Sequence, residues 1–380
     1  MPQHAFTRSV LVCLSLLLAT CGGGGSANPP PSRSFAMGFT PWPYAATVAA
    51  VNDTYAKINA NGDLVAHHLD SGIPWQEALD GVAYPSAVEA EITARVNNTG
   101  AGKKVYLAIS PLNTGRTAIA DYWNNSGSGQ PLTAPWNGYT FTSPQVQTAY
   151  INFASDLIRR FNPEYFNLGI EASELILHDA RNGTTQYADY LSFVAAVSSA
   201  LKASFPNLKL MVSVGLKYPG TPDAQTLATY LPPLISYVDV VGASVYPYAF
   251  FGHANAGDPA NLPTNWLSQL QTIAGAKPIA VAETGWIAQP LLIPSLSVNV
   301  AATPANQDAY VQALFGQAQA LNAKFVVWFS VVDYDDLWTN ALGQDPVAQI
   351  WRDTGLYDET VTARPALTTW QRRLGYTLTP

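Results

Sequence analysis

The sequence predicts an α/β fold, a single (β/α)8 barrel, from three observations. Short apolar runs alternate with helical patterns in eight units over about 340 residues. These runs are apolar on both faces, as parallel strands covered by helices must be. The chain is also 48% hydrophobic and 12% charged, so it has enough apolar material for one large core.

The expected elements follow one another in a regular order. The strands are predicted at residues 34–39, 63–69, 104–110, 165–171, 209–214, 238–246, 278–283 and 324–332. Apolar residues at i, i+3 and i+4 spacing predict helices at 45–60, 86–98, 143–161 and 185–205, with weaker patterns near 222–236, 264–274 and 305–322, and an eighth near 344–352 or 364–374. A doubly wound open sheet is the alternative, but no G-x-G-x-x-G follows the first strand.

The N-terminal segment resembles an export signal. An apolar run from Val10 to Ala19 has the length of a signal-peptide core and is too short to span a bilayer. It leads into Leu18-Ala19-Thr20-Cys21, which resembles a bacterial lipobox with Thr20 as a slight departure. We therefore expect a lipoprotein signal peptide at 1–20 and a lipid anchor on Cys21, with an ordinary secretory signal as the alternative. Both predict export from the cytoplasm, either to a bacterial membrane or cell surface or to the periplasm or medium.

A glycine- and proline-rich tether is predicted at 21–33, followed by one domain at 34–376. The formal net charge is -7, and no basic cluster follows the first 35 residues. Nucleic acid is therefore not an expected partner, and a neutral substrate is. Both cysteines, Cys13 and Cys21, precede the domain, which excludes disulfides and thiolate chemistry within it.

Two glutamates are predicted to face each other across the barrel mouth. The active site of such a barrel lies at the carboxyl ends of its strands. Glu171 closes the expected fourth strand and Glu283 closes the seventh. Two carboxylates in different environments are the groups that glycoside hydrolysis needs. The sequence therefore predicts a glycosidase with a carbohydrate substrate.

Aromatic and short polar residues accompany this pair at the strand ends. Aromatic faces stack on sugar rings, and carboxylates and amides bind hydroxyl groups. The long loop at 112–143 is rich in aromatic residues, which favours a cleft and therefore endo action. The predicted substrate-binding residues are Trp42, Asp70, Trp75, Asn113, Tyr246, Tyr248, Trp286 and Trp328.

The remaining polar residues give weaker indications of function. His67 and His68 are adjacent on an expected strand, so at most one faces the barrel centre, and we predict no metal or other cofactor. Asp333, Asp335 and Asp336 could bind Ca²⁺ but fit a solvated loop better. Lys217 could form a Schiff base in an aldolase-type or lyase barrel, which is a third functional alternative.

Three short motifs resemble clan A retaining glycoside hydrolases: "AETGW" at the seventh strand, "SVYPY" at the sixth and "LGIEASE" at the fourth. The layout is most similar to the family 53 β-1,4-galactanases and their uncharacterised relatives, and "ETGW" also resembles the family 17 β-glucanases. The resemblance implies a (β/α)8 barrel with Glu283 as nucleophile and Glu171 as acid/base. It also implies that Tyr246 bonds the nucleophile and that Trp328 forms the floor of the −1 subsite.

One position departs from the pattern of that clan. The residue before the acid/base glutamate is usually an asparagine that bonds the substrate 2-hydroxyl, and here it is Ile170. Glu174, one helical turn further on, is a second candidate acid. The competing prediction is a non-catalytic surface glycan-binding protein on a hydrolase-like barrel.

Overall fold

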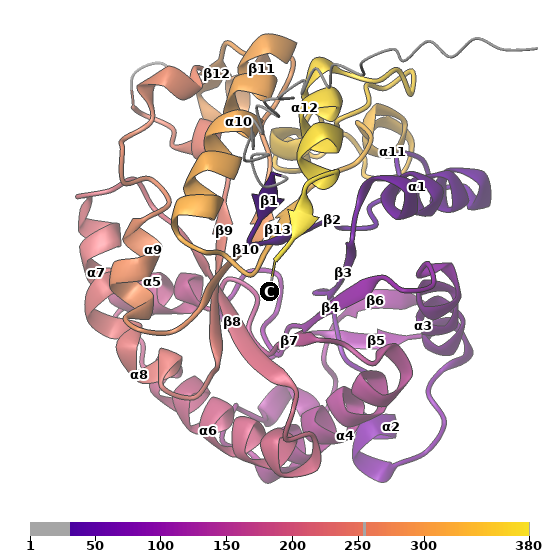
Figure 1. Cartoon of the computed structure of the whole chain (residues 1–380). Helices are drawn as coiled ribbons and strands as arrows, with labels where there is room; N and C mark the ends of the chain where they lie inside the picture. The colour runs from indigo at the N-terminus through magenta and orange to yellow at the C-terminus, as the bar shows by residue number, and fades with distance from the viewer. Residues whose placement is uncertain (1–30, 254–255, 380) are drawn as a thin grey trace, which may run out of the picture. The chain divides into compact units, whose positions relative to one another are not determined.

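The computed structural model describes residues 31–253 and 256–379, which form a closed barrel of eight parallel strands ringed by helices (Figure 1). Around the barrel the strands are ordered β10-β13-β2-β3-β4-β7-β8-β9. This confirms the predicted (β/α)8 fold. The barrel strands are β2 (Ala36–Phe39), β3 (Leu64–Leu69), β4 (Lys104–Ile109), β7 (Tyr165–Asn167), β8 (Lys209–Gly215), β9 (Val240–Val245), β10 (Ile279–Thr284) and β13 (Phe325–Trp328).

Helices form the outer layer. Threonines cap several of them: the side chains of Thr47, Thr221 and Thr303 accept hydrogen bonds from backbone N–H groups in the first turns of α1, α7 and α10. The helices of the described residues are α1 (Val48–Asn61), α2 (Trp75–Asp80), α3 (Ser86–Asn98), α4 (Pro144–Phe161), α5 (Ser173–Asn182), α6 (Gln186–Ser204), α7 (Pro222–Tyr230), α8 (Pro232–Ile235), α9 (Gln269–Ala274), α10 (Pro304–Ala320), α11 (Asp335–Asn340) and α12 (Pro365–Leu374).

Two hydrophobic layers hold the barrel together. The inner one fills the barrel and includes Leu64, Ala66, Tyr106 and Met211. The outer one lies between strands and helices and contains the alternate strand residues, such as Val65. This alternation decides which side chains at the strand ends can face the barrel mouth.

The first and last described segments meet at the end of the barrel where the strands begin. Strand β1 (Ser32–Arg33) pairs in parallel with β14 (Thr377–Leu378). Arg33 lies 2.6 Å from Asp63, the residue before β3. This ion pair and the short strand pairing join the two ends of the described chain, and residues 32–33 and 377–378 lie just outside the predicted domain bounds of 34–376.

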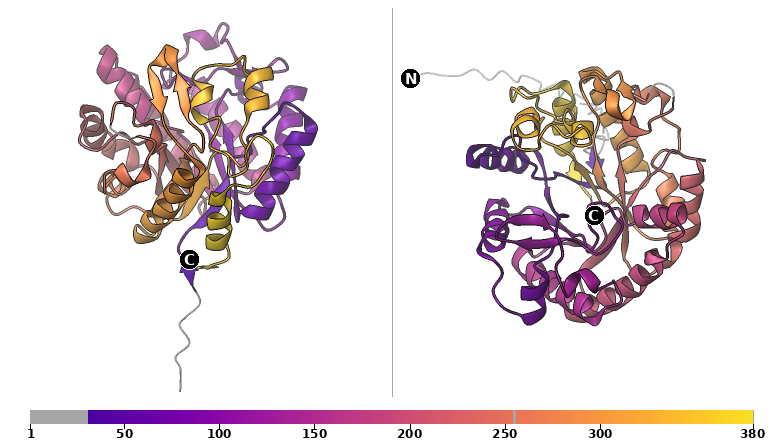
Figure 2. Two further views of the ribbon diagram at one scale, coloured as in Figure 1. Left: turned by 90° about the horizontal axis from the view of Figure 1, so that it is seen from above. Right: turned by 180° about the vertical axis from the view of Figure 1, so that it is seen from behind.

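The loops also contain small β-hairpins and 3₁₀ helices of three or four residues. Strands β5 (Tyr122–Asn124) and β6 (Gly127–Gln130) form a hairpin in the long loop after β4. Strands β11 (Leu291–Ile293) and β12 (Val298–Val300) form another after β10, and in the left view of Figure 2 this hairpin lies at the opposite end of the barrel from the C-terminal segment. The 3₁₀ helices are Trp136–Gly138, Pro247–Ala249, Pro259–Asn261, Pro294–Leu296 and Ala348–Trp351.

None of the helices in the described part of the chain is both long and apolar enough to cross a bilayer. The predicted signal peptide at 1–20, Cys21 and most of the tether lie outside the described residues. Of the two alternatives for the eighth helix, 364–374 corresponds to α12, whereas 344–352 contains only a 3₁₀ turn.

Candidate active site

Glu283 lies near the carboxyl end of β10, and its carboxylate faces the barrel mouth. The pairing of β10 with β9 is irregular between Val281 and Glu283. The next residue, Thr284, is buried on the other face, where its hydroxyl lies 2.6 Å from the Val245 carbonyl. Tyr246 donates its hydroxyl hydrogen to Oε1 of Glu283, and Nδ1 of His68 lies 3.1 Å from Oε2. Both oxygens of this carboxylate therefore have a polar partner.

Glu171 approaches the same mouth from a loop. Strand β7 ends at Asn167, four residues earlier than the expected strand end. Glu171 has a left-handed backbone with φ 48°, an uncommon conformation for a residue with a side chain. Its N–H donates to the Ser213 hydroxyl at 3.1 Å, and the Ser244 hydroxyl donates to its Oε1 at 2.7 Å. Strands β8 and β9 thus position this carboxyl group.

An arginine links Glu171 to a third acid, Asp70. Arg116, in the loop after β4, is buried and lies 2.6 Å from Asp70 and 3.5 Å from Oε2 of Glu171. It is absent from the set predicted from sequence, because a residue in a long loop carries no periodic signal of its direction. Its backbone φ of 55° also lies in the left-handed region.

The two glutamates have opposite pKa shifts. Burial raises the pKa of Glu171, the Arg116 charge lowers it in part, and the negative charge of Glu283 raises it further. Burial also acts to raise the pKa of Glu283, but the hydrogen bond and charge of His68 and the Tyr246 hydroxyl outweigh it, and the pKa is lowered. Glu171 is therefore the carboxyl that keeps a proton more readily, and Glu283 is the ionised one.

Two cavities meet these carboxyls. The first, of about 510 Å³, is lined by Glu283 and by residues of the β2, β3 and β13 ends. The second, of about 720 Å³, is lined by Glu171 and by residues that follow β8 and β9. Side-chain exposures of 33% for Glu171 and 21% for Glu283 leave both groups accessible to a ligand.

The first cavity holds several buried polar atoms without a hydrogen-bond partner among the described residues. These are Nε1 of Trp42, Nε2 of His68 and Oδ1 of Asp70. All three residues line the cavity. Unpaired buried donors and acceptors are costly unless a ligand or water satisfies them, so these atoms are available to bind a polar ligand.

Four predicted substrate-binding aromatics are placed elsewhere, and the prediction for them is corrected. Trp75, Tyr248, Trp286 and Trp328 are fully buried in the outer hydrophobic layer. The indole N–H of Trp75 donates to Ala120 O, that of Trp328 to Thr354 O, and the Tyr248 hydroxyl to Ile350 O. Trp286 stacks on Tyr310, with ring centroids 4.7 Å apart. These side chains pack strands against helices and do not reach either cavity lining.

The aromatic residue that does line the cavity at the end of β13 is Phe329. Because side chains alternate along a strand, the indole of Trp328 points toward the helices and its neighbour points inward. The sequence prediction was therefore wrong by one residue at this position. Trp42 packs against Phe329 with ring centroids 5.7 Å apart and completes this wall.

Trp351 lines the second cavity, where its ring lies edge-to-face on Tyr246 with centroids 5.8 Å apart. It belongs to a 3₁₀ turn after α11, and no sequence pattern singled it out. Asn113, predicted to bind substrate, instead organises its own loop: its Oδ1 accepts from the Thr117 N–H at 2.8 Å. It is not among the residues that line the two cavities.

The remaining candidates have structural partners. His68 faces the mouth, whereas His67 is buried on the outer face with Nε2 2.8 Å from the Thr99 hydroxyl. Glu174 and Lys217 form an ion pair of 2.6 Å in the second cavity. Ile170 is buried in the inner hydrophobic layer, so its side chain offers no polar contact to a ligand.

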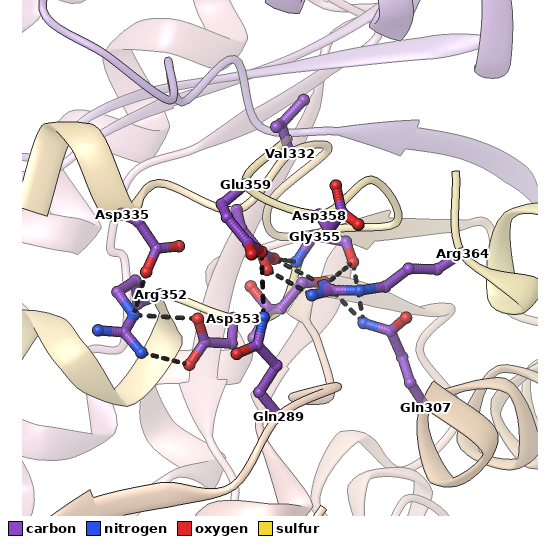
Figure 3. Close-up of polar contacts among 12 residues, drawn as sticks. Gln289, Gln307, Val332, Asp335, Arg352, Asp353, Gly355, Asp358, Glu359 and Arg364 are labelled. Carbon is purple, nitrogen blue, oxygen red and sulfur yellow. Dashed lines mark hydrogen bonds and ion pairs between the residues drawn. The ribbon is translucent and has the colours of Figure 1, made fainter. Parts of the chain in front are cut away.

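Arginines pair with three of the aspartates after β13, namely Asp333, Asp335 and Asp353, and Figure 3 shows Arg352 with Asp335 and Asp353. Asp333 is fully buried and receives two hydrogen bonds from Arg364, at 2.8 and 2.5 Å. Asp335 lies 3.1 Å from Arg352, which also binds Asp353. Oxygen atoms of Asp333, Asp335 and Glu359 lie within 4.8 Å of one another, and Arg364 and Arg352 pair with Asp333 and Asp335.

No family model matches the sequence, and no curated protein matches it significantly in sequence. Several solved structures are similar in fold. The exo-β-1,4-mannosidase Op5Man5 from Opitutaceae bacterium strain TAV5 has a TM-score of 0.61 at 13% identity, over 89% of this chain and 58% of that chain. This chain thus spans little more than half the length of that protein.

Two further structures are similar. A GH5_18 variant from Bifidobacterium longum subsp. longum ATCC 55813, in complex with Manb1-4GlcNAc, has a TM-score of 0.59 at 14% identity, over 91% of this chain and 80% of that chain. The β-glucuronidase of Ruminococcus gnavus has a TM-score of 0.53 at 11% identity, over 90% and 50%. At such identities the similarity establishes the barrel fold, which this chain shares with these glycosidases.

Proposed function

We propose that the protein is a retaining glycoside hydrolase with Glu283 as nucleophile and Glu171 as acid/base. The observation that carries this proposal is the opposite pKa shift of two accessible carboxyls at one barrel mouth. A double-displacement glycosidase needs one ionised and one protonated carboxyl in this arrangement. Retention further requires carboxyl groups about 5 to 5.5 Å apart.

Each neighbouring side chain has a role in this mechanism. Glu171, whose pKa is raised by burial and by the charge of Glu283, protonates the leaving oxygen as Glu283 attacks the anomeric carbon. Glu171 then takes a proton from the water that hydrolyses the glycosyl–enzyme bond. Tyr246 and His68 hold the nucleophile in place, and Arg116 orients Asp70 and Glu171.

The substrate we propose is a neutral β-linked poly- or oligosaccharide. The two cavities extend to different sides of the carboxyl pair, which allows sugar units on both sides of the cleaved bond and favours endo action. Trp42, Phe329 and Trp351 supply aromatic surfaces for sugar rings. Family 53-like activity on β-1,4-galactan is one specific form of this proposal.

The test is a screen of the protein against β-linked polysaccharides and activated aryl β-glycosides, with Glu283→Gln measured alongside. The proposal expects turnover by the wild type and none by Glu283→Gln, which should still bind the glycan. Glu164→Gln is the matched control, because Glu164 pairs with Lys104 just before β7, at the opposite end of the barrel from the cleft, and this variant should turn over substrate as the wild type does. Equal turnover by the wild type and Glu283→Gln would reject the mechanism.

A second candidate, a non-catalytic surface glycan-binding protein, is favoured by one observation. Ile170 stands where the clan carries the asparagine for the 2-hydroxyl, and it is buried in the inner layer. This candidate predicts glycan binding that Trp42→Ala and Phe329→Ala weaken, with no hydrolysis of any activated glycoside. Turnover that Glu283→Gln abolishes would exclude it.

We also propose that the protein is exported with residues 1–20 as a lipoprotein signal peptide and is anchored through Cys21. The apolar run and the tether sequence at 21–33 support this. Mass spectrometry of the mature N-terminus should find a diacylglyceryl cysteine at position 21, and Cys21→Ala should release the protein from membranes. A mature N-terminus elsewhere in the chain would contradict the lipid anchor.

A further inference from the structure

The end of the barrel where the strands begin, named here the barrel floor, carries an excess of positive charge. Four lysines stand at or just before strand starts: Lys103, Lys209, Lys277 and Lys324 precede or open β4, β8, β10 and β13. Helices α4 and α12 lead into β7 and β14, which begin at this end of the barrel or lie there, so the last turns of these two helices also reach the floor. The last turns of α4 and α12 contribute Arg159, Arg372 and Arg373.

The acidic residues of the floor do not neutralise these cations. The acids before β3, β7 and β9 are each already paired: Asp63 with Arg33, Glu164 with Lys104 and Asp239 with Lys202. Within residues 31–253 and 256–379, none of the seven cations named above forms an ion pair. The floor is therefore basic, although the chain as a whole has a net charge of -7.

Helix electrostatics explain only part of this pattern. Arginines in the last turn of a helix are favoured by the helix dipole, which accounts for Arg159, Arg372 and Arg373. Two of the strand-start lysines also have local partners: Lys103 donates to the carbonyls of Asn59 and Gly62 at the end of α1, and Lys277 donates to those of Ser236 and Val238 after α8. Lys209 and Lys324 make no such contact among the described residues. Lys209 is exposed, as are Arg159 and Arg372, and these three therefore face solvent without a counter-charge.

Two further features fit an interface with lipid. Arg372, Arg373 and Tyr376 line a cavity of about 340 Å³ at this end. Tyr237, just before β9, is 41% exposed, and tyrosines are enriched where proteins meet the headgroup region of a bilayer. The described chain also enters the barrel here, because β1 lies beside β14 and directly precedes β2.

We propose that the barrel floor binds an anionic lipid bilayer, so that the cleft at the other end points away from the membrane. From Cys21 to Ser32 there are 11 residues, and an extended chain spans at most about 3.3–3.6 Å per residue. A lipid on Cys21 would thus hold the floor, where the described chain enters the barrel, within about 36–40 Å of the headgroups. Basic residues near an anionic surface add attraction that salt screens.

The first experiment removes the anchor and tests the floor alone. The full chain carrying Cys21→Ala is mixed with vesicles of phosphatidylcholine, with or without phosphatidylglycerol, and the bound fraction is measured by co-sedimentation at low and high salt. The proposal expects binding only to vesicles with phosphatidylglycerol, and loss of that binding at high salt. Absence of binding to the anionic vesicles, or equal binding to both kinds, would overturn it.

Charge variants identify the surface. Lys209→Gln, Arg159→Gln and Arg372→Gln together should weaken vesicle binding about tenfold or more. The matched control, Lys209→Arg with Arg159→Lys and Arg372→Lys, keeps the charges and should bind as the parent does. Arg181→Gln removes a cation that is 59% exposed but paired with Asp223, away from the floor, and should have little effect. An equal loss from Arg181→Gln and Lys209→Gln would reject the floor as the binding surface.

Orientation gives an independent readout. In a chain with Cys13→Ala and Cys21→Ala, a fluorophore is attached through Thr377→Cys on the floor or through Ser126→Cys in the β5–β6 hairpin. Brominated lipids should quench the label at position 377 and leave that at position 126 bright. Stronger quenching at position 126 would place the cleft end against the membrane and contradict the proposal. Neither readout depends on glycoside hydrolysis.

Discussion

Two clusters of arginines and carboxylates lie at the same end of the barrel and differ in how fully they are paired. In the cleft cluster, Arg116 contacts Asp70 and Glu171, and both acids keep solvent exposure. In the cluster after β13, Arg364 and Arg352 bind Asp333 and Asp353, whose side chains are buried (Figure 3).

The difference separates a structural network from a binding site. Asp333 accepts from Arg364 with both oxygens and also from the Gly355 N–H at 2.7 Å, so no ligand is needed. In the cleft, Asp70 Oδ1 and His68 Nε2 lack partners beside an open cavity. Residue type alone does not distinguish Asp333 from Asp70; saturation of their hydrogen bonds does. Oδ2 of Asp335, at the edge of the cluster after β13, also lacks a partner among the described residues.

The largest expected effect is on turnover, and it falls on the cleft alone. Glu283→Gln removes the proposed nucleophile and should lower kcat for an activated β-glycoside by more than about 10⁴-fold. The unfolding free energy should change little, because the amide is nearly the same size. Steady-state kinetics and thermal unfolding measure the two quantities. A turnover within tenfold of wild type would place the nucleophile elsewhere.

The next largest expected effect is on the unfolding free energy, and a matched pair of arginine variants tests it. Arg364→Met leaves Asp333 as a buried, unpaired charge and should lower the unfolding free energy by about 3–5 kcal/mol. Arg116→Met should destabilise less, because Asp70 and Glu171 remain partly exposed. Denaturant titration tests both, and a larger loss from Arg116→Met than from Arg364→Met would contradict the comparison.

Arg116→Met should also change the pH profile. The Arg116 charge lowers the pKa of Glu171, so its removal raises that pKa. Glu171 acts as an acid while protonated, and activity is lost as pH rises through its pKa. The alkaline limb of kcat/KM should therefore move to higher pH in Arg116→Met and stay in place in Arg364→Met.

Trp328 and Phe329 give a similar contrast between adjacent residues. Trp328→Ala opens a hole in the outer layer and should lower the unfolding free energy by about 3–5 kcal/mol. Phe329→Ala removes a cavity wall and should raise KM or weaken glycan binding with a smaller loss of stability. Equal effects of both variants on glycan affinity would show that the inward orientation of Phe329 does not determine glycan binding.

The smallest expected effect is a shift of the acid limb. Glu283 must be ionised, and His68 helps to lower its pKa below the ordinary value of 4.5. In His68→Ala that pKa rises, so activity should be lost at a higher pH as the solution is acidified. His67→Ala, which changes the neighbouring residue on the outer face, should leave the acid limb unchanged. If the acid limb of the pH–activity profile moves in neither variant, His68 does not lower the pKa of Glu283.

The sequence predicted the barrel because its strands are continuous apolar runs, and it placed Glu171 and Glu283 at strand ends by counting those runs. The sequence could not show which way a side chain points once the chain has passed the last residue of a strand that pairs with its neighbour. The assignment to Trp328 instead of Phe329 comes from this limit, as does the strand expected to continue to Glu171. Arg116 and Trp351 lie in irregular segments, where no periodicity indicates which tertiary partners they meet.

Tryptophans at strand ends did not predict which residues line the cleft. Trp75, Trp286 and Trp328 occur at the positions where sugar-binding residues were expected, but each fills the layer between strands and helices. Large aromatic residues contribute more buried area than any other type, so packing competes with binding for the same positions. Burial, which only the fold reveals, decides between them.

The most direct test of the assigned roles is the anomeric configuration of products from two alanine variants given azide. In Glu283→Ala, azide enters the space of the missing nucleophile and attacks the β-glycoside directly, so the account predicts an α-glycosyl azide. In Glu171→Ala, azide attacks the glycosyl enzyme in place of water and should give a β-glycosyl azide. Proton NMR distinguishes the two products. The reverse pair of configurations, or no azide adduct from either variant, would contradict Glu283 as nucleophile and Glu171 as acid/base.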